Sequence, residues 1–188
     1  MARVFVDTNV LFPFSVMDLM LALTEDFVHE VLWSEALLAE WERVIVREER
    51  RSAASAASIT AAIREFFPDS EVRAAEYLGL VERMPGDDPD DRLHMAAALA
   101  GRASAIITWN RSDFPAAPLA RLGLQVTGPD EYLCGLLSEF PDEVTATVVR
   151  LAAEKRRPPL TVGDLVGVLA KAGVSTFAER LSSIIAVS

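Results

Sequence analysis

The chain has 188 residues, of which 51% are hydrophobic, a composition typical of a globular protein with a packed core. Its net charge of -10, from 18 basic and 28 acidic residues, excludes a protein that holds nucleic acid through an overall positive surface. The length allows one domain of about 100 to 150 residues and a smaller appendage.

The sequence gives no indication of disulfides, of a signal peptide or of a membrane span. The single cysteine, Cys134, cannot form an internal disulfide, and the sequence opens without a signal-peptide pattern. The most apolar early stretch is interrupted by Pro13 and Asp18 and falls short of the roughly 20 apolar residues of a membrane span. We therefore expect a cytoplasmic protein without a membrane-spanning segment.

The first predicted element is a buried strand. Residues 4–6 form an apolar run that stops at three polar residues, and a second run of this kind spans residues 28–34. From Ser34 onward, apolar residues recur at helical spacing, so Ser34 is expected to be the N-cap of a helix. A strand followed by a helix is the repeating unit of an α/β layer.

The middle of the chain continues this alternation. Residues 52–62 are expected to be helical, either as a continuation or after a break, and a short helix begins at Pro68. An alanine-rich helix to about Arg102 precedes a buried strand at residues 105–107 and a short strand within residues 123–129. The pattern predicts a three-layer α/β/α fold with a central parallel sheet.

The tail is predicted to be helical. From about Leu136 no further strand is indicated, and helices are expected at residues 143–157, 161–173 and 175–185. Thr161 and Ser175 are the predicted N-caps of the last two. We therefore divide the chain into a domain at residues 1–135 and a small all-helical region at residues 136–188.

Four acids are placed where a parallel sheet brings ligand-binding residues together, beyond the carboxyl ends of its strands. Asp7 follows the first strand and Asp113 lies in a loop after the strand at residues 105–107. Asp91 lies in the first turn of a helix, and Glu40 lies midway along another. Converging carboxylates repel unless a cation lies among them, and Mg²⁺ or Mn²⁺ prefers oxygen ligands. Zinc is less favoured, because the chain has only two histidines and one cysteine.

The acidic segment PGDDPDD also has a purely structural explanation. Asp88 followed by Pro89 matches a helix N-cap with proline at the first helical position, and the macrodipole favours Asp90 and Asp91 in the first turn. This explanation accounts for Asp88 and leaves Asp91 free to bind metal. We expect His94 to lie on the helix surface and not to be a ligand.

Four segments together resemble a PIN domain, a metal-dependent ribonuclease fold, over most of residues 1–135. They are DTN after the first strand, LLAEWERV, DPDDRLHMAAAL and IITWNRSDFP. The helical tail resembles the extra C-terminal region of a subset of VapC-type toxins of bacterial toxin–antitoxin pairs. The resemblance implies that the metal-binding, catalytic acids are Asp7, Glu40, Asp91 and Asp113.

The resemblance also implies a set of supporting or substrate-contacting residues, namely Thr8, Asn9, Thr108 and Asn110. Some relatives carry an acid where this chain has Asn110, so the site here depends on Asp113. Glu40 has a competing explanation, since Arg43 lies three residues further along its helix and could form an ordinary surface ion pair.

Candidate RNA contacts lie next to these acids. Three arginines follow Glu40 at helical spacing and could hold phosphates, and a tryptophan beside Asn110 could stack on a base: Arg43, Arg47, Arg50 and Trp109. The alternatives are an arginine face paired with neighbouring glutamates and a tryptophan that only packs.

The sequence therefore predicts a divalent-metal-dependent endoribonuclease that uses Mg²⁺ or Mn²⁺, the toxin of a toxin–antitoxin pair. Its partners would be an RNA substrate, a cognate antitoxin and a second copy of the chain. One alternative is a catalytically inactive PIN-like module that binds RNA or protein. A phospho-acceptor signalling domain is less favoured, because Thr8 and Asn9 stand where it needs paired acids and no lysine precedes Lys155.

Overall fold

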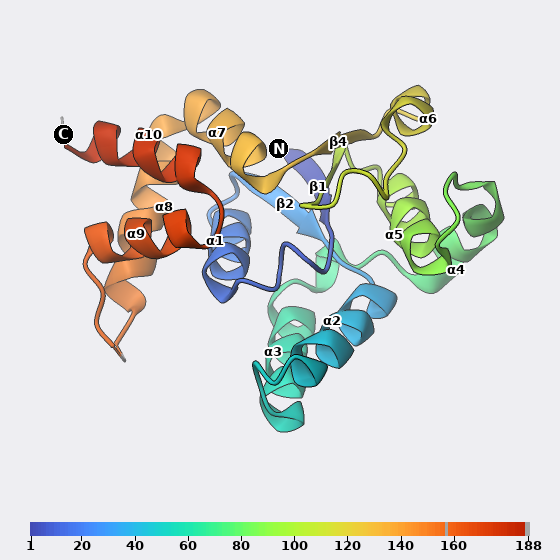
Figure 1. The fold of residues 1–188 in the computed structure, drawn as a ribbon, viewed down its shortest axis with the longest axis horizontal. Helices are drawn as coiled ribbons and strands as arrows, with labels where there is room; N and C mark the ends of the chain where they lie inside the picture. The colour runs from blue at the N-terminus through green and yellow to red at the C-terminus, as the bar shows by residue number, and fades with distance from the viewer. Residues whose placement is uncertain (157, 187–188) are drawn as a thin grey trace.

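The fold is built on one four-stranded parallel sheet. The computed structural model describes residues 1–156 and 158–186, and in it the strands run in the order β2-β1-β3-β4 (Figure 1). Their bounds are Ala2–Val6 (β1), His29–Leu32 (β2), Ala105–Ile107 (β3) and Gln125–Thr127 (β4). The register pairs Val6 with Ile107, so β1 and β3 end at the same edge. The predicted parallel α/β fold is confirmed.

Helices cover both faces of this sheet. Helix α1 (Phe14–Glu25) packs against β2, and α5 (Pro89–Ala100) packs against β1 and β3 from the other side (Figure 1). The other elements of this part are α2 (Glu35–Arg47), α3 (Ala53–Phe66), η1 (Pro68–Ser70), α4 (Ala74–Tyr77), η2 (Leu78–Arg83) and α6 (Ala116–Arg121). Helices α2 and α3 pack on each other.

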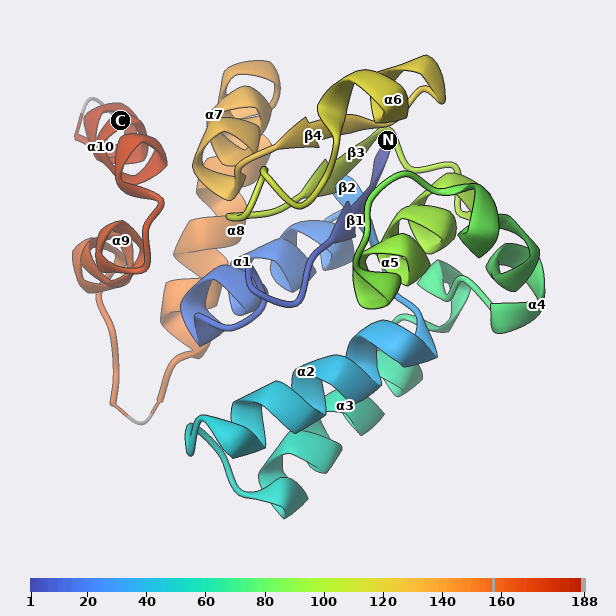
Figure 2. The same ribbon diagram turned by 45° about the vertical axis from the view of Figure 1, so that its right-hand side comes forward.

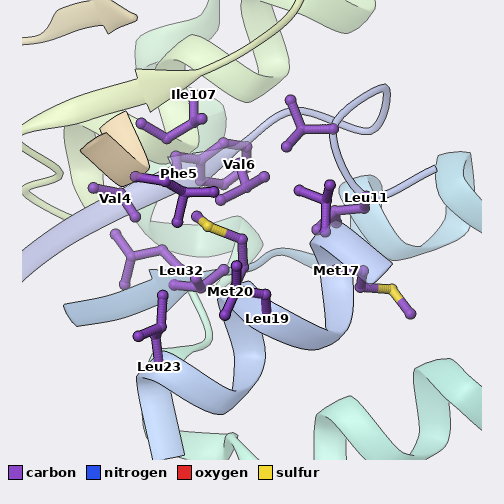
Figure 3. Close-up of a cluster of buried hydrophobic side chains, with 14 of the residues drawn as sticks. Val4, Phe5, Val6, Leu11, Met17, Leu19, Met20, Leu23, Leu32 and Ile107 are labelled. Carbon is purple, nitrogen blue, oxygen red and sulfur yellow. The ribbon is translucent and has the colours of Figure 1, made fainter. Parts of the chain in front are cut away.

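The central strand explains why the layers form. Val4, Phe5 and Val6 are all fully buried, although successive strand side chains point to opposite faces of a sheet. Both faces must therefore be covered, and the apolar side chains of α1 and of the neighbouring strands fill one of them (Figure 3). The run of three apolar residues that predicted a buried strand has this physical basis.

The regular elements described in the C-terminal part are all helices, as predicted. Its helices are α7 (Pro129–Glu139), α8 (Pro141–Glu154), α9 (Val162–Lys171) and α10 (Ser175–Ile185), which lie on the α1 side of the molecule (Figure 2). Helix α8 packs against α1, where Arg150 forms ion pairs with Glu25 and Asp26. No described helix is both long enough and apolar enough to cross a bilayer.

Several local predictions can be compared with this arrangement. Ser34 and Thr161 are N-caps as predicted, and Ser52 begins α3 as a separate helix after a break. Helix α8 ends at Glu154, before the predicted end at Arg157, which lies outside the described residues. The division of the chain between residues 135 and 136 stays a prediction.

Two features of the fold were not anticipated. Helix α1 was not predicted, because its side chains are buried on several sides and show no clear apolar stripe. The prediction that Ser175 caps α10 is wrong. The carboxylate of Asp130, on α7, instead accepts hydrogen bonds from the backbone N–H groups of Thr176 and Phe177, at 3.2 and 2.8 Å. A cap supplied from another helix leaves no local sequence signal.

Candidate active site

Asp7 occupies the edge where β1 and β3 end. It is 7% exposed, and its backbone N–H donates to the carbonyl of Ile107 at 2.9 Å. Its Oδ2 accepts hydrogen bonds from Nδ2 of Asn9 at 2.6 Å and from Oγ1 of Thr108 at 2.7 Å. Two of the predicted supporting residues therefore fix the orientation of this carboxylate, and its position follows directly from the strand register.

Glu40 and Asp91 come from two helices that approach the same edge. Glu40 lies midway along α2, and Asp91 lies in the first turn of α5, just after the N-cap Asp88 and Pro89. The structural explanation for Asp88 is confirmed, since its carboxylate accepts the backbone N–H of Asp90 at 2.8 Å. Asp91 is partly buried and free of this capping role.

His94 lies one turn after Asp91 and connects two of the acids. Its Nε2 is 3.0 Å from Oε2 of Glu40, and its Nδ1 is 3.7 Å from Oδ1 of Asp7. The side chain is 3% exposed, so the expectation that His94 lies on the helix surface is wrong. The alanines that follow it on α5 are buried too, so this part of the helix faces the interior. The carboxylates opposite the His94 ring give it polar contacts, which explains why it can be buried there.

The loop after β3 positions Asp113. The side-chain amide of Asn110 donates to Oδ2 of Asp113, and Oγ of Ser112 donates to Oδ1 of Asp113 at 3.3 Å. The backbone N–H of Asn110 in turn donates to Oγ1 of Thr108 at 2.9 Å. Asn110 therefore holds Asp113 in place, and Ser112 joins it as a supporting residue that sequence reasoning missed.

All four acids line one cavity of about 570 Å³, together with Thr8, Asn9 and Trp109. Phe12, Pro13, Val44 and Glu48 complete its wall. Of these, Phe12 and Glu48 had no chemical signature in the sequence, since an aromatic residue before Pro13 and a glutamate at a helix end are ordinary surface features. The predicted acids thus come from four segments and face a common space.

Negative charge is concentrated in this cavity. Burial raises the pKa of Asp91, and the charges of Asp88, Asp113 and Asp7 raise it further, to about 6. A carboxyl group with a pKa raised by its neighbours marks a place where a cation would lower the electrostatic free energy.

Residues 3–112 match the family model of the PIN domain, which covers more than half of the chain. The chain belongs to the PIN-domain family. Residues 129–183 also match the model of the VapC50 C-terminal domain. Comparisons with curated proteins and with solved structures gave no match. The protein is therefore a VapC-type PIN domain with a C-terminal extension, and at the level of the family a toxin nuclease.

The acids of this PIN domain fit a divalent cation by their donor chemistry. They supply carboxylate oxygens, and Oε2 of Glu40, although close to His94, has no hydrogen-bond partner among the described residues. The acids line one cavity without forming a compact ligand cluster. Within residues 1–156 and 158–186, no three His, Cys, Asp or Glu side chains form a group that could hold a metal ion. His94 instead lies between two of the acids.

The candidate RNA contacts of the PIN domain divide into two groups. Among the described residues, Arg43 forms its ion pair with Asp90, at 3.6 Å, and none with Glu40, and Arg47 is paired with Glu48. Arg50 lies over the ring of Phe12, at 5.4 Å from the centroid, and has no acidic partner within the part of the chain that the structure describes. The three arginines therefore do not form one row along the acid cavity, and of the three, Arg50 has no ion pair with any residue that the structure describes.

Trp109 has two environments at once. It is 39% exposed and lines the acid cavity, while its backbone N–H donates to Oδ1 of Asn9 at 3.1 Å. Its ring packs on Gly173, where an added Cβ would lie 2.9 Å from Cη2 of the tryptophan. Packing and a position on the cavity wall are thus both present.

His94 gives this PIN domain a testable dependence on pH. Burial lowers the pKa of His94, but contacts with Asp7 and Glu40 outweigh burial and raise it from 6.5 to about 9. The folded state therefore binds this proton more tightly than the unfolded state does. The resulting stabilisation is complete below about pH 6.5 and is lost as the pH rises to about 9.

We expect metal-free protein to lose on the order of 3 kcal/mol of unfolding free energy between these pH values. Urea denaturation in the presence of chelator measures the change. The His94→Gln variant is the reference, because it lacks the titrating group. Parallel pH profiles for wild type and His94→Gln would contradict the assignment.

Proposed function

We propose that the protein is a divalent-metal-dependent endoribonuclease that cleaves RNA phosphodiester bonds. The observation that carries this proposal is the position of Asp7, Glu40, Asp91 and Asp113 on one cavity at the carboxyl edge of the sheet. Membership of the PIN family supports nuclease chemistry in general. The proposal goes beyond family membership in three points: the bound metal, the RNA substrate and the roles of the four acids.

Each residue of the site has a stated task. The four acids would hold Mg²⁺ or Mn²⁺, which when bound would activate water and stabilise negative charge on the phosphate. Asn9 and Thr108 hold Oδ2 of Asp7, and its Oδ1 lies 3.7 Å from Nδ1 of His94. Asn110 and Ser112 orient Asp113 by donating to its two carboxylate oxygens. Thr8 and Trp109 line the cavity, where they would contact the bound RNA strand with a polar and an aromatic side chain.

Metal dependence is the first test. Protein stripped with chelator should leave a labelled single-stranded RNA intact, and Mg²⁺ or Mn²⁺ should restore cleavage in a dose-dependent way. The expectation follows from the acidic cavity, which repels a polyanion unless cations are present. Cleavage that persists at full rate in excess chelator would exclude the proposed mechanism. Binding of RNA without cleavage at any metal concentration would favour an inactive PIN-like module.

A toxin role would require a partner that inhibits the nuclease. VapC-type proteins imply an antitoxin and an RNA substrate in general, and we propose that this chain acts in the cytoplasm as a homodimer neutralised by an antitoxin. Co-expression with the product of the neighbouring reading frame should yield a complex that does not cleave RNA. A neighbouring product that neither binds the protein nor inhibits its cleavage of RNA would contradict this role.

A further inference from the structure

A second cavity, of about 400 Å³, lies beside the acid cavity. Phe12 and Pro13, in the loop between β1 and α1, line both spaces. The rest of its wall comes from the first residue of α1, from the turn between α2 and α3, with Arg50 and Arg51, and from the end of α9, with Lys171. The C-terminal extension and the PIN domain therefore build this cavity jointly.

The charge of the second cavity is opposite to that of the first. Three of its described lining residues are basic, namely Arg50, Arg51 and Lys171, and none of them is acidic. This composition is unusual in a chain with a net charge of -10. We call it the basic pocket.

The cations of the basic pocket are available to a ligand. The guanidinium of Arg50 lies over the ring of Phe12, and that of Arg51 lies 4.0 Å from the centroid of Phe14. Within the described part of the chain, none of the three basic residues has an ion-pair partner, whereas Arg64 and Arg150 do. All three are exposed. Stacking on aromatic rings holds the two arginines in position. Nη1 of Arg51 also donates to the carbonyl of Arg50 at 3.2 Å, and the other guanidinium N–H groups of the pair face no acidic partner among the described residues.

The two cavities share Phe12 and Pro13 as lining residues, and a second contact joins their walls. Gly173, directly after the basic-pocket residue Ala172, packs on Trp109, which lines the acid cavity. Its φ of 105° and its close approach to the ring both require glycine. The turn after α9 thus supports the wall of the acid cavity while Lys171 faces the neighbouring space. A strand leaving the acids would pass Trp109 and Phe12 before it reaches the cations.

We propose that the basic pocket binds backbone phosphates of the RNA strand next to the bond that is cleaved. This inference rests on the proposed function, and it assigns to the C-terminal extension a direct part in substrate binding through Lys171. Arginine and lysine are the side chains that recognise phosphate, and aromatic rings beside them accept unpaired bases. The pocket would also offset the repulsion between RNA and the acids.

The test measures RNA binding separately from cleavage. Full-length protein in excess chelator is titrated against a fluorescently labelled single-stranded RNA at several salt concentrations. The triple variant Arg50→Ala, Arg51→Ala, Lys171→Ala should bind about tenfold or more weakly, and the salt dependence of its log affinity should be smaller by about 2. The control carries Arg83→Ala, Arg121→Ala and Arg180→Ala, which remove equal charge from residues outside both cavities.

The outcomes distinguish the inference from the function it rests on. Equal affinities and equal salt slopes for the triple variant and its control would overturn the basic pocket, even if metal-dependent cleavage is found. The predicted difference in binding without any cleavage would support the pocket and contradict the nuclease. If the triple variant fails to fold by circular dichroism, Lys171→Glu carries the test, because this exposed residue ends α9; unchanged binding would again overturn the inference.

Discussion

Replacing Asp7 by asparagine is expected to lower the rate of RNA cleavage by about three orders of magnitude while leaving the fold intact. The carboxylate lies at the sheet edge, where Asn9 and Thr108 hold one oxygen and the other faces His94. An asparagine oxygen can accept the same two hydrogen bonds. The substitution therefore removes the charge that a metal ion needs and keeps most of the local contacts.

The control for Asp7→Asn is Asp87→Asn. Asp87 is exposed and does not line the acid cavity, so the same change in charge should leave cleavage within about twofold of wild type. Both variants are compared in single-turnover cleavage with Mn²⁺, and circular dichroism verifies the fold. An Asp7→Asn protein that cleaves as fast as the Asp87→Asn protein would remove Asp7 from the site.

Replacing Trp41 by alanine is expected to lower the free energy of unfolding by about 3 to 5 kcal/mol. The side chain is 1% exposed and packs edge-on against Phe14, with ring centroids 6.0 Å apart. Its Nε1 donates to the carbonyl of Leu11 at 3.1 Å. Trp41 thus connects α2, which carries Glu40, to the loop after β1, and its loss leaves both a void and an unsatisfied carbonyl.

The comparison for Trp41→Ala is Trp109→Ala, measured by urea denaturation under the same conditions. Trp109 is 39% exposed, so its removal should cost well under half as much stability. The less disruptive Trp41→Phe keeps most of the packing and should fall between wild type and Trp41→Ala. A smaller loss for Trp41→Ala than for Trp109→Ala would contradict the packing described here.

The parts of the fold that could be predicted depend on local patterns. A run of apolar residues ended by polar ones identified β1 and β3, and serine before a periodic segment identified the start of α2. These patterns arise because burial and capping act within a few residues. The strand ends then placed Asp7 and Asp113 at one edge, the predicted helices placed Glu40 and Asp91 near it, and the PIN resemblance implied a metal-binding role for all four.

The parts that could not be predicted depend on contacts between distant segments. His94 is buried because α5 packs against β1, and Asp130 caps a helix far along the chain. Neither fact is visible in the local sequence, since a histidine three residues after Asp91 fits a helix surface equally well. The basic pocket has the same origin, because Lys171 approaches Arg50 and Arg51 only after the extension has packed on α1.

The four acids are proposed to hold the metal on which RNA cleavage depends. The most direct measurement is the rate of RNA cleavage as a function of added Mn²⁺, for chelator-stripped wild type and for Asp91→Asn. Asp91 faces the cavity and its pKa is raised by neighbouring carboxylates. The variant should therefore need about tenfold or more Mn²⁺ for half-maximal cleavage, at a lower maximal rate. Superimposable Mn²⁺ curves for the two proteins would contradict the account.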